Sequence, residues 1–304
     1  MSIGISLYPD NAQDPLALIG QADMAMYRAK AEGRNTFRFF NQNDGLHARE
    51  SLSLETRMRR GLEKEEFLLY YQPLVSQGKV VSFEALLRWI PTGGNLIGPD
   101  KFIPIAEETG LIVPLGAWAL RAACRQAKAW QGMGYPGLCI AVNLSVRQFH
   151  SPQLLPLIEE VLQKTGLAPE CLELELTESM FMDGVAQAID TLHALKAIGV
   201  MLSIDDFGTG YSSLSYLTRF PIDKLKIDQS FIAGLHSNSS DNSIVSAIIA
   251  MGRALRMKVV AEGVETDSQR IDLEMMNCDQ FQGYLFRRPG PADEVTAWLS
   301  EQPR

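Results

Sequence analysis

Residues 201–214 read MLSIDDFGTGYSSL, a short apolar run that ends in two adjacent aspartates and a turn with two glycines. An apolar run of this length is typical of a buried strand. The neighbouring carboxylates Asp205 and Asp206 repel each other, and such a pair costs little free energy only in water or beside a cation. The stretch therefore predicts a strand that ends either at a metal site or in a solvated Asp-Asp turn.

The composition indicates a globular chain with a substantial core. Of the 304 residues, 46% are hydrophobic, which is sufficient for one large barrel or two ordinary domains. The formal net charge of −8 argues against a surface that binds DNA or RNA polymers, although a metal-dependent site can still take a nucleotide through its cations. An enzyme whose cleft gathers carboxylates fits this charge.

The cysteines, histidines and apolar runs limit the possible cellular location of the chain and the type of metal site that it can contain. The four cysteines are widely separated with no C-x-x-C pair, which predicts reduced thiols in the cytoplasm. The four histidines show no ligand spacing, so a histidine-based metal centre is not expected. No run approaches about 18 apolar residues, so we expect a soluble segment without membrane contact, while a longer parent protein could still be anchored upstream.

From Phe67 onward, short apolar strands alternate with helical patterns. This order over roughly 240 residues predicts an α/β fold, a (β/α)8 TIM-like barrel. Only residues 76–79 separate the first two strands, too few for a parallel crossover of about a dozen residues, so the first strand should be antiparallel. The predicted strands are 67–75, 80–89, 138–145, 171–178, 200–207, 223–229, 257–262 and 280–286, and the predicted helices include 102–131, 153–166, 185–198, 241–256 and 266–277.

Two further parts precede the barrel. Residues 1–40 read as strand, helix and strand, at 2–7, 14–32 and 35–40, a unit too small to bury both faces of its strands. Residues 44–66 predict an amphipathic helix that is either a signalling element or a plain connector. The predicted organisation is a small N-terminal α/β fragment at 1–40, a linker helix at 41–62 and the barrel domain at 63–304.

Polar residues recur at seven strand ends, which is where the active sites of such barrels assemble. In residues 172–176, LELEL, leucines and glutamates occupy opposite faces, so Glu175 points into the barrel if the leucines meet the outer helices. Glu178 lies past the strand end and is suited to holding a loop. The strand-end set is Glu84, Asn143, Glu175, Asp205, Asp206, Lys226, Asp228, Glu262 and Gln282.

The chemistry of this set points to divalent cations. Carboxylate and amide oxygens without histidine or cysteine favour Mg²⁺ or Mn²⁺, and one shared carboxylate can bridge two ions about 3.5 to 4 Å apart for displacement at phosphorus. Asp205 and Asp206 reach one site only if the backbone bends, which Gly208 and Gly210 make easy. Lys226 could then orient a water molecule or screen charge on phosphoryl oxygens.

Each of these residues also has an ordinary explanation when it is taken alone. Single acidic residues at strand ends are usually solvated, Lys226 could be a surface lysine, and Asn143 could cap the next helix. The agreement of seven strand ends is what favours a single metal-dependent site.

The strand-end residues stand in longer strings. These strings are YYQP at 70–73, EALLRW at 84–89, NLS at 143–145, ELTES at 175–179, DDFGTGYSSL at 205–214, LKID at 225–228, AEGVE at 261–265 and QGY at 282–284. Together they resemble the EAL phosphodiesterase family across residues 60–290. The resemblance implies hydrolysis of the bacterial second messenger cyclic di-GMP to the linear dinucleotide pGpG.

The resemblance implies a site for two ions, Mg²⁺ or Mn²⁺, and a catalytic lysine. Lys226 would act with the ions on the attacking water, beside Glu84 and Glu262. The ligands of the first ion would be Glu84, Asn143, Glu175 and Asp205. The ligands of the second ion would be Asp205, Asp206 and Glu262, so Asp205 would be shared.

The resemblance also implies substrate contacts and supports for the loop after Asp206. Arg88 would contact a phosphate and Gln72 a guanine, and Asp228 and Gly283 belong to the same substrate-binding set. The loop at 207–214 is expected to be mobile and close to the interface of a homodimer formed through the barrel. The implied loop supports are Glu178, Glu265 and Gln282.

The N-terminal fragment carries a second resemblance. Residues 2–6, SIGIS, and 22–35, ADMAMYRAKAEGRN, resemble the C-terminal portion of a GGDEF (diguanylate cyclase) domain. The signature loop of that family would lie upstream, so we expect this fragment to make no cyclic dinucleotide. One local difference from the EAL family is the basic pair Arg287 and Arg288, for which the sequence offers no function.

Two other functions explain part of the pattern. A non-catalytic cyclic di-GMP receptor would typically lack metal ligands or the ordered loop, and neither loss appears in this sequence. A Mg²⁺-dependent barrel that abstracts protons from carboxylate substrates explains the ligands but not the strings around Gln72 and Arg88.

Overall fold

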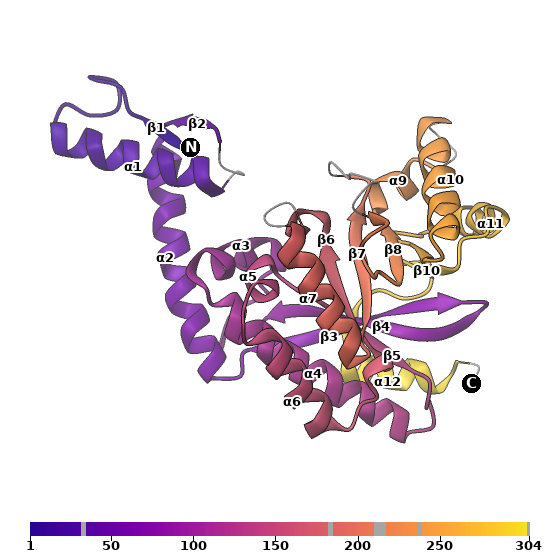
Figure 1. Cartoon of the computed structure of the whole chain (residues 1–304). Helices are drawn as coiled ribbons and strands as arrows, with labels where there is room; N and C mark the ends of the chain where they lie inside the picture. Colours follow the sequence, from indigo (N-terminus) through magenta and orange to yellow (C-terminus); the bar gives the residue numbers. More distant parts are fainter. Residues whose placement is uncertain (32–34, 182–184, 210–216, 236–238, 303–304) are drawn as a thin grey trace. The chain divides into compact units, whose positions relative to one another are not determined.

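The computed structural model describes residues 1–31, 35–181, 185–209, 217–235 and 239–302. The chain divides into two compact units, one of Met1–Phe67 with Trp89–Leu111 and the other of Leu68–Arg88 with Ile112–Arg304 (Figure 1). The residues of the predicted site all belong to the second unit.

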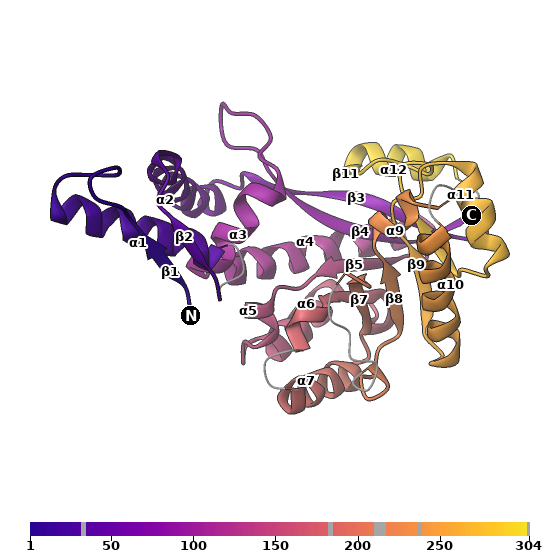
Figure 2. The same cartoon turned by 90° about the horizontal axis from the view of Figure 1, so that it is seen from above.

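Eight strands close into a barrel, as the alternation of strands and helices predicts (Figures 1 and 2). Strand β10 pairs in parallel with β9 and antiparallel with β3, which closes the ring and confirms that the first strand is reversed. Gln77 and Gly78 connect β3 to β4 with φ of 50° and 73°, as a two-residue hairpin turn requires. The strands are β3 Phe67–Ser76, β4 Lys79–Trp89, β5 Cys139–Asn143, β6 Leu172–Thr177, β7 Met201–Phe207, β8 Lys224–Ile227, β9 Lys258–Ala261 and β10 Gln280–Gln282.

Side chains along β6 alternate between the barrel interior and the hydrophobic core outside the barrel. Leu172, Leu174 and Leu176 are fully buried in the hydrophobic core, while Glu173 and Glu175 pair with lysines of β8. In Figure 2, α10 runs beside β8 and β9. The helices of this unit are α4 Ile112–Gly132, α5 Val146–Phe149, α6 Leu154–Thr165, α7 Val185–Ile198, α9 Gln229–Ala233, α10 Ser239–Ala254, α11 Asp267–Met275 and α12 Ala292–Ser300, with 3-10 turns η1 Pro169–Cys171 and η2 Glu178–Phe181.

The prediction of a single helix over 102–131 is wrong. Two helices, α3 Pro99–Thr109 and α4 Ile112–Gly132, occupy this stretch. Gly110 ends α3 with φ of 79°, and its N–H donates to the carbonyl of Glu107. Apolar residues continue across the break, so their periodicity did not reveal it.

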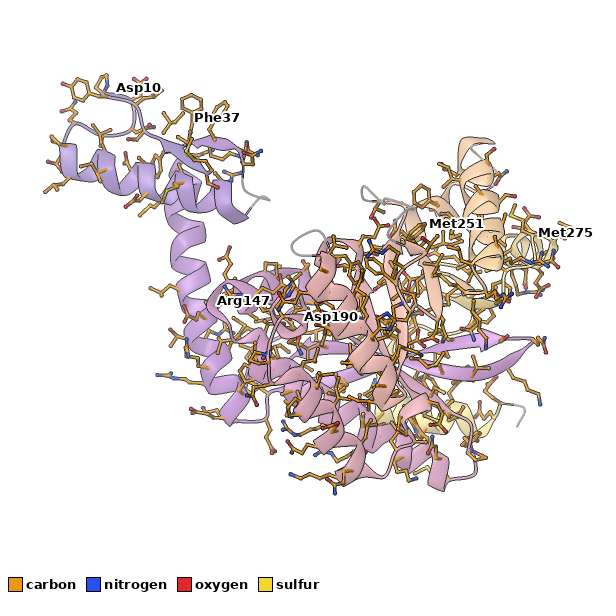
Figure 3. The ribbon with its side chains drawn as sticks, in the orientation of Figure 1. Asp10, Phe37, Arg147, Asp190, Met251 and Met275 are labelled. Atoms are coloured by element: carbon orange, nitrogen blue, oxygen red, sulfur yellow. The ribbon has the colours of Figure 1, made fainter. Side chains whose placement is uncertain are left out.

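The first unit contains the small strand–helix–strand fragment and the linker helix. Strands β1 Ile3–Ile5 and β2 Phe37–Phe39 pair in parallel, α1 Pro15–Ala31 lies between them in sequence, and α2 Gln42–Glu63 follows. Figure 3 shows Phe37 projecting from β2, and its surface is 54% exposed. The end of the predicted first helix, at residue 32, falls outside the described residues.

A short additional strand, β11 Gly290–Pro291, pairs with Tyr71 and Tyr70 of β3.

Within the ranges that the structure describes, no helix is both long enough and apolar enough to cross a lipid bilayer.

Candidate active site

A fully buried lysine lies at the centre of the strand-end residues. Lys226 Nζ lies 2.8 Å from Glu175 Oε1, 3.0 Å from Asp205 Oδ1 and 2.6 Å from Glu262 Oε1. A fourth carboxylate, Glu84, is 3.7 Å away. Burial alone would lower the pKa of Lys226, but the surrounding carboxylates raise it well above its usual value. Lys226, on β8, therefore stays protonated and forms ion pairs with carboxylates from β4, β6, β7 and the residue that follows β9.

The amide side chains predicted for the site bind the Glu84 carboxylate. Asn143 Nδ2 donates to Glu84 Oε1 at 2.7 Å, and Gln282 Nε2 donates to Glu84 Oε2 at 2.6 Å and to Gln72 Oε1 at 3.1 Å. Burial alone would raise the pKa of Glu84, but Lys226 and these hydrogen bonds hold it below its usual value. Burial and the charge of Glu84 raise the pKa of Glu175 well above its usual value. Glu84 is therefore ionised at lower pH than Glu175.

A backbone bulge brings both aspartates of β7 toward the site. The register between β7 and β8 shifts between Ile204 and Phe207, and Asp206 has φ of 52°. Aspartate tolerates this left-handed conformation better than most residues because its short side chain bonds locally. The bend therefore begins at Asp206 itself, and Gly208 continues it with φ of 101°, while Gly210 lies outside the described residues.

An acidic cluster that could hold a metal ion results from this bulge. Carboxylate oxygens of Asp205, Asp206 and Glu262 lie within 4.8 Å of one another. Burial, followed by the charges of Asp205 and Asp228, raises the pKa of Asp206 to about 6. Burial and the nearby carboxylates raise the pKa of Glu262 to about 8, against the attraction of Lys226.

Glu178 contacts the chain that follows the bulge. Its Oε1 accepts a hydrogen bond from the amide of Gly208 at 3.0 Å, and Thr209 Oγ1 donates to the carbonyl of Asp206 at 2.8 Å. A Cβ at Gly208 would lie 2.9 Å from the ring of Phe231, so the glycine permits close packing there. The rest of the predicted loop, residues 210–214, falls outside the described residues.

A cavity of about 300 Å³ opens above these carboxylates. Arg88 lies at its wall, stacks 5.4 Å over the ring of Tyr70, and donates from Nη1 to the carbonyl of Leu87 at 2.8 Å. A Cβ at Gly283 would collide with the backbone of Val264, which explains why glycine stands there. The predicted residues that line the cavity are Gln72, Glu84, Arg88, Asp205, Glu262, Glu265, Gln282 and Gly283.

Sequence reasoning missed part of the cavity lining, and the predicted substrate-binding residue Asp228 lies beside Asp206 rather than in the lining. Asp228 caps α9, where its Oδ1 accepts from the amide of Ser230 at 3.0 Å, and it is not among the lining residues. Four of the missed residues lie within two positions of an identified site residue, and the fifth, Pro289, follows the basic pair, so these positions in the sequence were the available signal. They are Leu86, Gln229, Gly263, Tyr284 and Pro289.

The chain thus combines a (β/α)8 barrel with a reversed first strand and a carboxylate cluster that could hold a metal ion beside a buried lysine. The chain belongs to the EAL domain family, whose model matches residues 55–289. A second model, the diguanylate cyclase GGDEF domain, matches residues 1–36.

The chain is similar to bacterial signalling proteins over nearly its whole length. It is 48% identical over 98% of its residues to a protein of Caulobacter vibrioides named an uncharacterized signaling protein. It is 46% identical over 97% of its residues to the bifunctional diguanylate cyclase/cyclic di-GMP phosphodiesterase MucR of Pseudomonas aeruginosa. These matches cover 37% and 44% of the two relatives, so the chain spans about two fifths of their length.

Solved structures are similar to the barrel part of the chain as well. The MucR phosphodiesterase in complex with c-di-GMP superposes with a TM-score of 0.77 at 46% identity, covering 80% of this chain and 99% of that one. The similarity therefore extends from sequence to fold in the part of the chain that carries the carboxylates.

Proposed function

We propose that this chain is a metal-dependent phosphodiesterase that hydrolyses cyclic di-GMP to linear pGpG. The observation that carries the proposal is the set of strand-end oxygen ligands gathered around Lys226 beneath an open cavity. The similarity to MucR, which is named a cyclic di-GMP phosphodiesterase and was solved with c-di-GMP, supports the choice of substrate.

The donor set fits two hard cations, Mg²⁺ or Mn²⁺. All of the candidate ligands are carboxylate or amide oxygens, and Glu175 Oε2 is buried with no hydrogen-bond partner among the described residues. When bound, such ions polarise phosphoryl oxygens and lower the pKa of water. Glu84, Asn143, Glu175 and Asp205 would hold one ion, and Asp205, Asp206 and Glu262 would hold the other.

The chain's own groups would orient the reactants. Lys226, a permanent cation, would donate hydrogen bonds to the attacking water and screen the charge that develops on the phosphoryl oxygens. Arg88 would pair with a phosphate, and Gln72 would contact a guanine from the cavity wall. Glu178 would keep the chain after Asp206 in place through the Gly208 amide.

The test is product analysis with purified protein. Incubation with cyclic di-GMP and either Mg²⁺ or Mn²⁺ should yield pGpG, separated by chromatography. Absence of pGpG with both metals contradicts the proposal. Tight binding without turnover at saturating metal would instead identify a receptor.

The proposal extends to the organisation of the chain. The chain would comprise the C-terminal portion of a GGDEF domain at 1–40, a linker helix at 41–62 and the catalytic domain at 63–304. Two chains would form a homodimer through the barrel. A cytoplasmic location is in keeping with the four free cysteines. Light scattering tests the dimer, and a mass equal to one chain at micromolar concentration contradicts it.

A further inference from the structure

An arginine lies on an exposed tyrosine at the cavity wall. The Cζ of Arg288 lies 4.0 Å from the centroid of the Tyr284 ring, the shortest such contact among the described residues. Tyr284 lines the cavity and is 47% exposed. Pro289, the next residue along the chain, also lines the cavity, so Arg288 stands between two wall residues.

The two arginines of the basic pair have different surroundings. Arg287 Nη2 lies 3.8 Å from Glu294, and its Cζ lies 5.4 Å from the ring of Trp298, so its charge faces α12. Arg288 is exposed, and no carboxylate among the described residues forms an ion pair with it. Its guanidinium is therefore held by an aromatic face while its charge is uncompensated.

The backbone that carries Arg288 is fixed at both ends. Before it, the amide of Leu285 donates to the carbonyl of Val264 at 3.0 Å. After it, β11 pairs with Tyr71 and Tyr70 of β3. The stacked guanidinium thus has a defined place on Tyr284 beside the cavity, which reduces the entropy lost when it binds a ligand.

The charges around the cavity are arranged in two zones. The cavity is lined by the carboxylates of Glu84, Asp205 and Glu262 and by Arg88, which stacks on Tyr70. Arg288 is not itself a lining residue, but it stacks on the lining residue Tyr284 and precedes the lining residue Pro289. A cyclic dinucleotide has two phosphodiester groups, each with one negative charge. If the reacting group lies at the proposed metal ligands, the other group lies away from them, where a cation at the edge of the cavity would compensate its charge.

We propose that Arg288, held on Tyr284, binds the phosphodiester group that is not cleaved, so the site selects ligands with two phosphates. This inference rests on the proposed function. A guanidinium stacked on a ring leaves its N–H edges free, and their planar fork matches two phosphate oxygens. The contact is made equally in the ground state and the transition state, so it acts on KM rather than on kcat.

The test compares a substrate with two phosphates and a substrate with one. Arg288→Ala should raise KM for cyclic di-GMP about tenfold with little change in kcat, as expected for losing a charge-assisted hydrogen bond. The same variant should hydrolyse bis(4-nitrophenyl) phosphate, a single diester, like the unmodified chain. Arg288→Lys keeps the charge without the planar fork and should recover part of the affinity.

A matched control removes the same charge elsewhere. Arg253 lies in the last turn of α10, at the end of the barrel where β9 begins, opposite the strand ends that hold the carboxylates. Arg253→Ala should leave the kinetics with both substrates unchanged. Equal losses of Arg288→Ala on both substrates, or no loss on cyclic di-GMP, contradict the inference.

A binding measurement separates the inference from the proposed function. With EDTA present to prevent turnover, calorimetry should show a Kd for cyclic di-GMP about tenfold higher for Arg288→Ala than for the unmodified chain. An equal Kd contradicts the role of Arg288 even if pGpG is formed. Failure to form pGpG contradicts the proposed function even if the Kd values differ.

Discussion

At the scale of residues, Lys226 determines the electrostatics of the site. Its Nζ lies 2.6 to 3.0 Å from three buried or partly buried carboxylates, and the lysine itself is fully buried. A buried ion pair adds little net stability, but the loss of one partner leaves the others uncompensated.

Lys226→Met should therefore destabilise the metal-free chain by about 3 to 5 kcal/mol. Saturating Mn²⁺ should raise the melting temperature of this variant more than that of the unmodified chain, because the ions replace the missing positive charge. Thermal unfolding in EDTA and in Mn²⁺ measures both effects. Lys258→Met, on the exposed start of β9, is the control and should change stability by less than about 0.5 kcal/mol. Equal stability of the Lys226 variant and the control contradicts the prediction.

Metal binding should depend on pH through Glu262. The pKa of this side chain is raised from its ordinary 4.5 to about 8 in the metal-free fold. Between these values the folded chain binds more protons than the unfolded chain, so its stability should fall as pH rises through this range. A metal ligand must lose its proton, so Mn²⁺ affinity should rise up to about pH 8 and binding should release protons. Calorimetry at pH 6.5 and pH 8.5, in two buffers that differ in ionisation enthalpy, measures both quantities; equal affinities without proton release contradict the prediction.

Alternation predicted the direction of Glu175, and the same alternation applies to Glu173, which the sequence analysis did not single out. Glu173 pairs with Lys224 inside the barrel, two residues before Glu175 and Lys226 on the same strands. Alternation gives the face on which a side chain lies but not its partner, because β6 and β8 are separated by β7. The partnership of these lysines therefore required the three-dimensional structure.

At the scale of elements, the backbone leaves the extended conformation at the end of β7 and turns. Two adjacent aspartates can serve one site only because Asp206 adopts a left-handed conformation and breaks the register with β8. The sequence indicated that a bend was needed, whereas its exact residue depends on the pairing of β8. Glu178, from η2, then binds the amide of Gly208.

Glu178→Ala should loosen the chain after the bulge. Without its acceptor, the amide of Gly208 should exchange with deuterium about tenfold faster, and turnover of cyclic di-GMP should fall. Glu178→Gln keeps an acceptor oxygen and should retain most of the protection. Hydrogen exchange followed by NMR measures the amide directly, and identical rates in all three chains contradict this role for Glu178.

At the scale of the whole molecule, most of the architecture could be predicted from the order of its elements. The two-residue connection between β3 and β4 forces the hairpin, and closure by β10 follows from the number of strands. The break at Gly110 could not be predicted, since apolar residues on both sides of it continue the helical pattern. Strands β8 and β10 are also shorter than predicted. Asp228 after β8 caps α9, and Gly283 and Tyr284 after β10 line the cavity.

The proposed metal-dependent phosphodiesterase site requires its strand-end carboxylates, so the turnover of cyclic di-GMP by Glu84→Ala should reveal whether these carboxylates form it. Glu84 accepts hydrogen bonds from Asn143 and Gln282 and lies at the proposed first metal ion. Loss of this ligand should reduce pGpG formation by at least about 100-fold at saturating Mn²⁺, while the unmodified chain turns over. A folded Glu84→Ala chain that forms pGpG at the rate of the unmodified chain would contradict the account.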